Sequence, residues 1–149
     1  MTLIDELNTG PLANEIAPYI TAGHDGAIVE IMNRRDISAY GWITSADLNT
    51  WFALHNAEYI NVKTLAMDQQ SPFYAAANAL LNCLSGAIGE NALNLAAPEI
   101  MALVNNWPFV DQTGTAKAAL LSKGQKLISR AEQLGISVDT QAVAQALRG

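Results

Sequence analysis

The sequence has few of the residues on which disulfide scaffolds and disordered chains depend. Its 149 residues include one Cys, ten Gly and five Pro, and 15% of them are charged, against roughly 25% in an average soluble domain. A single Cys excludes a disulfide framework and a Cys-based zinc site. A hydrophobic content of 50% excludes intrinsic disorder. The length is typical of one domain, so we expect a single helical domain over residues 1–149.

No stretch of the sequence is apolar for long enough to predict a membrane span. The longest run without a charged residue, 69–89, is interrupted by Gln, Asn and Ser side chains that a membrane helix tolerates poorly. The first residues include Asp5 and Glu6, whereas a secretory signal begins with basic residues. We therefore expect no membrane partner and synthesis in a cytosol.

The net charge of −6 is unevenly distributed along the chain. Residues 1–60 carry eight acidic and two basic side chains, whereas residues 101–149 carry three and five. The basic residues of the last part would be spread around a helix and would not form one stripe: Lys117, Lys123, Lys126 and Arg130. Since nucleic-acid binding depends on a clustered basic face, we expect no nucleic-acid partner.

Apolar residues recur with helical spacing over most of the chain, which predicts an all-α fold, a single compact bundle of about seven or eight helices. Capping signals mark several helix starts: Thr2 with Asp5, Thr44 with Asp47, and Asp139. Pro98 suits the first turn of another helix, and Gly23 suits a helix end.

Two segments carry the more specific expectations. Residues Thr113 to Leu134 predict the longest helix, with Gly124 and Leu127 on its apolar stripe. Glycine is unfavourable inside a helix, so Gly124 indicates close packing against another helix, and Leu127 is expected in the core. The segment Ile37 to Ile43 is compatible with a short strand or an ordered loop, and we interpret it as a loop.

Residues able to perform catalysis or bind metal are scarce. His24 and His55 are the only histidines, and neither has a His or Cys at metal-ligand spacing. Cys83 lies between leucines with no basic residue nearby to stabilise a thiolate, so it is expected to be an inert core residue. The motifs of serine hydrolases, nucleotide-binding loops and zinc proteases are absent. We expect neither an enzyme nor a metal or cofactor site.

Four aromatic residues fall in predicted loops: Tyr40, Trp42, Trp107 and Phe109. Aromatic side chains in loops usually cover a core from outside, but they are also the residues that anchor protein interfaces. We interpret these four as candidate interface residues, with the core-covering role as the alternative.

Three stretches carry a resemblance to a known family. They are Leu-Asn-Thr-Gly-Pro-Leu at 7–12, Asn33-Arg34-Arg35, and Leu-Ile-Ser-Arg-Ala-Glu-Gln-Leu-Gly at 127–135, the last followed by Val143 and Ala146-Leu147. They resemble a family of small tailed-bacteriophage proteins in which N-T-[DG]-P-L near the start and I-S-R-A-E-[EQ]-L-G near the end bracket a variable middle. Relatives often continue with a Gly-Tyr-Ala-Gly-like stretch, where this chain has Glu15-Ile16-Ala17-Pro18.

The resemblance implies a protein from a phage structural gene block, without known catalytic residues. We therefore expect a non-catalytic structural subunit of a virion, in the tail, baseplate or fibre-attachment region. It would be made in the host bacterial cytoplasm and would contact other virion proteins and copies of itself. The alternatives are a capsid decoration or head–tail joining protein, a cytoplasmic assembly chaperone and, from another class, a host-directed regulatory binding protein.

Overall fold

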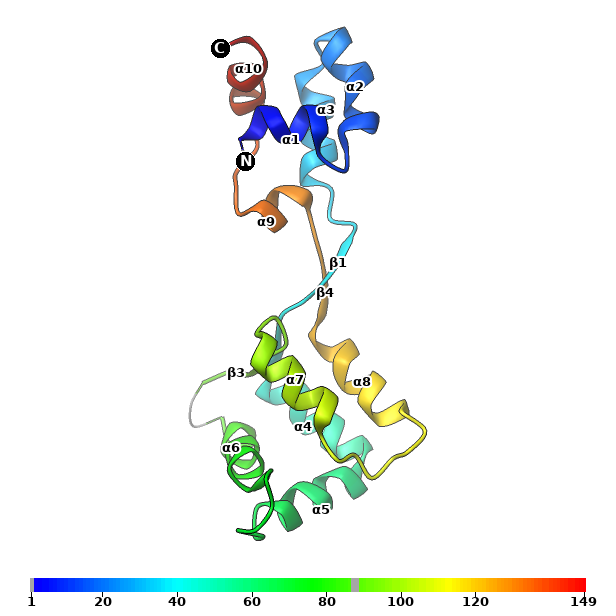
Figure 1. Cartoon of the computed structure of the whole chain (residues 1–149), viewed down its shortest axis with the longest axis vertical. Helices are drawn as coiled ribbons and strands as arrows, with labels where there is room; N and C mark the ends of the chain where they lie inside the picture. The colour runs from blue at the N-terminus through cyan, green and yellow to red at the C-terminus, as the bar shows by residue number, and fades with distance from the viewer. Residues whose placement is uncertain (1, 87–88) are drawn as a thin grey trace. The chain divides into compact units, whose positions relative to one another are not determined.

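The chain is divided into two compact units, each with its own core. A computed structural model describes residues 2–86 and 89–149. Unit 1 consists of Met1–Ser38 and Leu127–Gly149, and unit 2 consists of Ala39–Lys126. Both ends of the chain therefore belong to unit 1, and unit 2 is inserted between them in sequence (Figure 1).

The described residues of unit 1, 2–38 and 127–149, form five short helices. They are α1 (Leu3–Thr9), α2 (Ala13–Ala22), α3 (Asp25–Asn33), α9 (Arg130–Leu134) and α10 (Thr140–Arg148). The predicted capping box of Thr2 and Asp5 is present at the start of α1, and Gly23 ends α2 in the left-handed conformation. Asp139 caps α10 through the backbone N–H of Ala142. Local signals therefore set these three helix ends.

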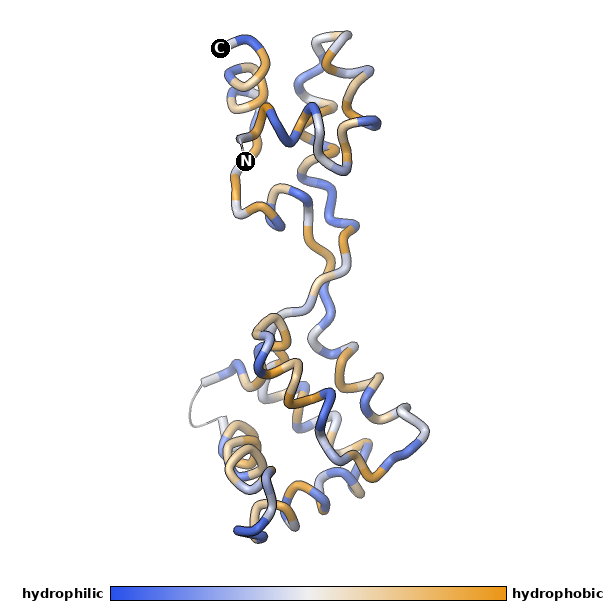
Figure 2. The backbone as a smooth tube through the Cα atoms, in the orientation of Figure 1, coloured by the Kyte–Doolittle hydropathy of each residue, from blue (hydrophilic) through white to orange (hydrophobic). Residues whose placement is uncertain are grey.

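The core of unit 1 is formed by both segments of the chain. Leu7, Ile16, Ile28 and Met32 come from the first segment, and Val143 comes from the second. Hydrophobic residues recur along the helices between hydrophilic ones (Figure 2), which gives each helix one apolar side to bury. Unit 1 is therefore complete only when residues 127–149 pack against residues 1–38.

Over its described residues, 39–86 and 89–126, unit 2 combines five helices with a two-stranded sheet. In chain order it contains β2 (Trp42–Thr44), α4 (Ser45–Leu54), α5 (Asn56–Leu65), α6 (Tyr74–Leu84), β3 (Asn91–Asn94), α7 (Pro98–Asn106) and α8 (Thr115–Gly124). Strands β2 and β3 are antiparallel, with Trp42 opposite Asn94 and Ile43 opposite Leu93. Ile43 is fully buried, so this sheet turns one face to the core of unit 2.

Helix α4 supplies the bulkiest part of that core. Leu48, Trp51 and Phe52 are buried on one side of it. The indole N–H of Trp51 donates to the carbonyl oxygen of Ala116 in α8 at 2.8 Å, so the one polar group of this ring is satisfied. Thr44 caps α4 through the backbone N–H of Asp47, as its spacing predicts.

The prediction of an all-α single compact bundle is wrong. The structure is 62% helical, and the residues that it describes form ten helices and four short strands in two antiparallel sheets. The second sheet joins β1 (Ile37–Tyr40) to β4 (Gln125–Ile128). Residues 37–44, interpreted largely as a loop, supply β1 and β2. Between these strands, the N–H of Gly41 donates to the carbonyl oxygen of Gly124, and the carbonyl oxygen of Gly41 accepts the N–H of Leu95.

The prediction of one long helix over residues 113–134 is also wrong, because this segment forms α8, β4 and α9 in succession. A Cβ atom on Gly124 would lie 2.5 Å from a methyl carbon of Leu95, the residue after β3. The glycine therefore permits close packing, as predicted, but its neighbour is the end of a strand and not another helix. Ser129 then starts α9 with a capping box. Leu127 lies in β4 with 57% of its surface exposed, outside the core.

Candidate functional site

All four predicted interface aromatics belong to unit 2, but they differ in their surroundings. Tyr40 ends β1, Trp42 begins β2, and Trp107 and Phe109 follow α7. Tyr40, Trp107 and Phe109 are partly buried and pack against the core of unit 2. Trp42 is 52% exposed. Only Trp42 of the four therefore offers a large apolar surface to a partner.

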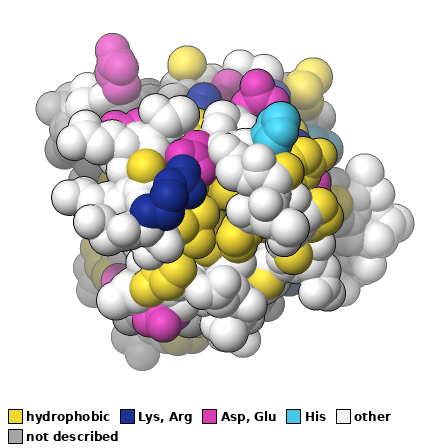
Figure 3. Space-filling view, turned by 90° about the horizontal axis from the view of Figure 1, so that it is seen from above, with side chains coloured by type: hydrophobic (Ala, Val, Ile, Leu, Met, Phe, Trp, Pro, Cys, Tyr) yellow, Lys and Arg dark blue, Asp and Glu magenta, His cyan; other side chains and the backbone are white. Residues whose placement is uncertain are grey.

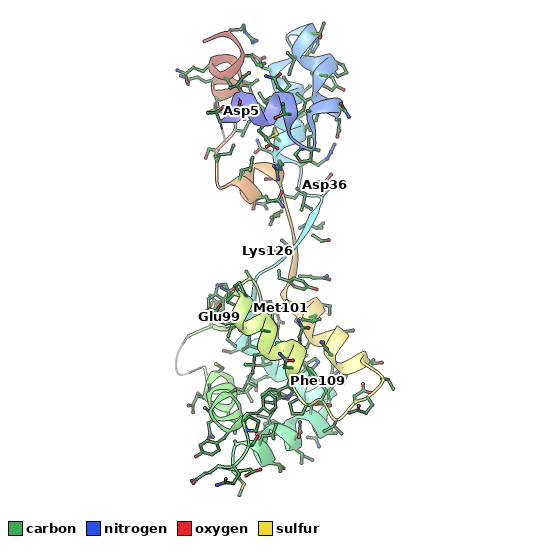
Figure 4. All side chains as sticks on the ribbon, in the orientation of Figure 1. Asp5, Asp36, Glu99, Met101, Phe109 and Lys126 are labelled. Atoms are coloured by element: carbon green, nitrogen blue, oxygen red, sulfur yellow. The ribbon has the colours of Figure 1, made fainter. Side chains whose placement is uncertain are left out.

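The two aromatic residues after α7 cover the core of unit 2. The ring of Trp107 meets Phe73 edge-on at 5.4 Å between centroids, and Phe109 meets Trp51 at 6.3 Å. Figure 4 shows Phe109 in the loop after α7, within unit 2. Edge-to-face contacts of this kind add to the stability that burial of the rings provides. These residues have the core-covering role that the sequence analysis left as the alternative.

Trp42 is exposed because successive side chains of a strand point to opposite faces of the sheet. Its neighbour Ile43 points into the core, so the indole lies on the opposite face of the sheet. Directly across from it, Asn94 accepts the backbone N–H of Ala96 at 3.1 Å through its side-chain oxygen. Among the described residues the indole of Trp42 has no hydrogen-bond or ring partner. Trp42 therefore stands on a short two-stranded sheet as an exposed, unpaired aromatic side chain.

A small apolar cavity lies in the core of unit 2. Its volume is about 30 Å³, and its walls include Trp51, Phe52, Trp107 and Phe109. Small-molecule sites usually measure about 300–1,000 Å³ and contain a few polar groups. The cavity is therefore much smaller than a typical small-molecule site.

The buried carboxylate of unit 2, Glu58 in α5, binds the backbone of a loop. Glu58 is buried and accepts the backbone N–H groups of Val110 at 3.2 Å and Asp111 at 2.8 Å. The Asp111 carboxylate in turn accepts hydrogen bonds from Thr113 and from the backbone of Ala116. The Thr113 side chain, followed by these backbone donors, lowers the pKa of Asp111. The sequence analysis did not single out either acid, and both hold the loop that precedes α8.

The histidines and the cysteine are divided between the two units. His24 is exposed before α3, whereas the ring of His55 lies 5.3 Å from that of Trp51 in unit 2. Cys83 is buried as expected, and this burial raises the pKa of its thiol. Over residues 2–86 and 89–149, no group of three or more His, Cys, Asp or Glu side chains is arranged to hold a metal ion.

The three stretches that carry the family resemblance all lie in unit 1, where their polar residues bond to one another and to the helices. The Asn33 amide donates to the carbonyl oxygen of Val138 at 2.8 Å. Arg34 forms a bidentate pair with Glu15, and Arg35 pairs with Glu132 at 2.6 Å. These side chains fasten the two segments of unit 1 and its helices, which explains them without a ligand.

A buried ion pair also joins the two segments of unit 1. Arg130 donates to both carboxylate oxygens of Glu6, at 2.5 and 3.0 Å. Glu6 is only 1% exposed and Arg130 16%. A Cβ atom at Gly10 would clash with the Glu6 carboxyl group and with its backbone oxygen. The glycine of the first stretch therefore makes room for the acid that pairs with the arginine of the last.

A basic patch would indicate a nucleic-acid partner, and a membrane-spanning helix would indicate a membrane partner. On the described part of the face seen in Figure 3, Lys and Arg side chains form no continuous basic patch. Of the helices within the described residues, none combines the length and the apolar character of a membrane span.

Comparison of the chain with protein-family models, with curated proteins and with solved structures finds no match.

Proposed function

We propose that the protein is a non-catalytic structural subunit of a bacteriophage virion, in the tail, baseplate or fibre-attachment region. The family resemblance of the stretches in unit 1 supports this assignment. The observation that carries it is Trp42, an indole 52% exposed on a sheet whose other face is buried. Exposed tryptophans without internal partners are typical of interface anchors.

The free energy of association expected from such a contact is modest for one copy and substantial for many copies. Covering about 100 Å² of indole contributes about 2.5 kcal/mol, at about 25 cal/mol per Å² of apolar surface. When several copies are held together in a ring or fibre, the contacts reinforce one another. A subunit that works in this way needs neither a ligand cavity nor a reactive group.

The test is incorporation of a Trp42→Ser variant into phage particles. Leu54 is the matched control, because it lies in the same unit, is 73% exposed and is the last residue of a different element, α4. We expect both variants to retain the far-UV circular dichroism of the parent. We expect Leu54→Ser to be found in purified particles by mass spectrometry and Trp42→Ser to be lost from them.

The outcomes separate the competing functions. If the parent protein is absent from purified particles but abundant in infected cells, the protein is an assembly chaperone or a host-directed regulator and the proposal fails. If Trp42→Ser enters particles as efficiently as the parent, the interface lies elsewhere on the chain. Particle fractionation into heads and tails then distinguishes a tail component from a capsid decoration or head–tail joining protein.

A further inference from the structure

We draw no further inference here: the strongest candidate, the apolar cleft of unit 1 lined by Leu3, Leu134 and Ile136, is an unpartnered surface, and nothing in the structure shows what covers it.

Discussion

At the scale of single residues, the charged groups of unit 1 fall into two energetic classes. The Glu6–Arg130 pair is buried and bidentate, whereas the Arg35–Glu132 pair is exposed, with side-chain exposures of 70% and 43%. Removing one partner of a buried pair leaves an unpaired charge in a poorly solvated site. An exposed pair is replaced by water at little cost.

We therefore expect Arg130→Ala to lower the free energy of unfolding by about 3–5 kcal/mol at neutral pH. The control, Arg35→Ala, should lower it by no more than about 1 kcal/mol. Urea unfolding followed by circular dichroism measures both values. Equal losses in the two variants would contradict this prediction, because they would show that the Glu6 carboxylate is solvated.

Two glycines provide a second contrast. Gly10→Ala should destabilise the protein by about 1–3 kcal/mol, because the new methyl group meets the backbone oxygen as well as the carboxyl group of Glu6. Gly26 lies in the first turn of α3 with nothing within 4 Å of an added Cβ. Gly26→Ala should stabilise by about 0.4–1 kcal/mol. Thermal melts of the two variants check this prediction, and a Gly10→Ala variant as stable as the parent would contradict it.

Several residue-level features could be predicted because their causes are local. The caps at Thr2, Thr44 and Asp139 and the helix end at Gly23 depend on neighbours within a few positions. The directions of Trp107 and Phe109 depend on Phe73 and Trp51, which are distant in sequence. Local sequence therefore predicts correctly that these rings lie in loops, but it does not determine whether they point toward the core or toward solvent.

At the scale of elements, the segment from Thr113 to Leu134 shows why periodicity alone is insufficient. Its leucines have helical spacing, yet the chain is extended over Gln125–Ile128 and starts a new helix after Ser129. The helix that the spacing suggests is interrupted in two places: α8 ends at the buried Gly124, and the capping box of Ser129 with Glu132 starts a new helix. The strands were missed because three or four residues contain too few alternations to be distinguished from a loop.

This difference in elements can be measured with two leucine substitutions. Leu120 is 5% exposed in α8, so Leu120→Ala should lower the free energy of unfolding by about 2–5 kcal/mol. Leu127 is 57% exposed in β4, so Leu127→Ala should change it by no more than about 0.5 kcal/mol. A continuous helix over 113–134 predicts a large loss for Leu127→Ala as well. Urea midpoints of the two variants decide between these arrangements.

At the scale of the whole molecule, carboxylates link the two segments of unit 1. Glu132 and Asp25 pair with arginines from the other segment, as Glu6 does. The hydrogen bond from Arg35 lowers the pKa of Glu132, and the one from Arg34 lowers the pKa of Glu15. Glu132 and Glu15 therefore bind protons less readily in the folded state than in the unfolded state.

The pH dependence follows from this difference. Stability contributed by Glu132 and Glu15 is complete above the ordinary carboxyl pKa of about 4.3 and is lost as pH falls through their lowered folded-state values. We expect the urea midpoint to fall between pH 5 and pH 3, and to fall less steeply in a Glu15→Gln, Glu132→Gln double variant. An equal slope in this variant and the parent would show that other groups govern acid unfolding.

The division of unit 1 into two segments also sets an order of events during synthesis. Residues 1–38 leave the ribosome first, but the helices that complete their core are encoded after residue 126. At about 5–20 residues per second, translation of the inserted segment takes roughly 5–20 s. Unit 2 is continuous in sequence and can fold during that interval. Meanwhile Leu7, Ile16 and Ile28 remain without their partners, so the nascent N-terminal segment is the part of the chain most exposed to aggregation and to capture by chaperones.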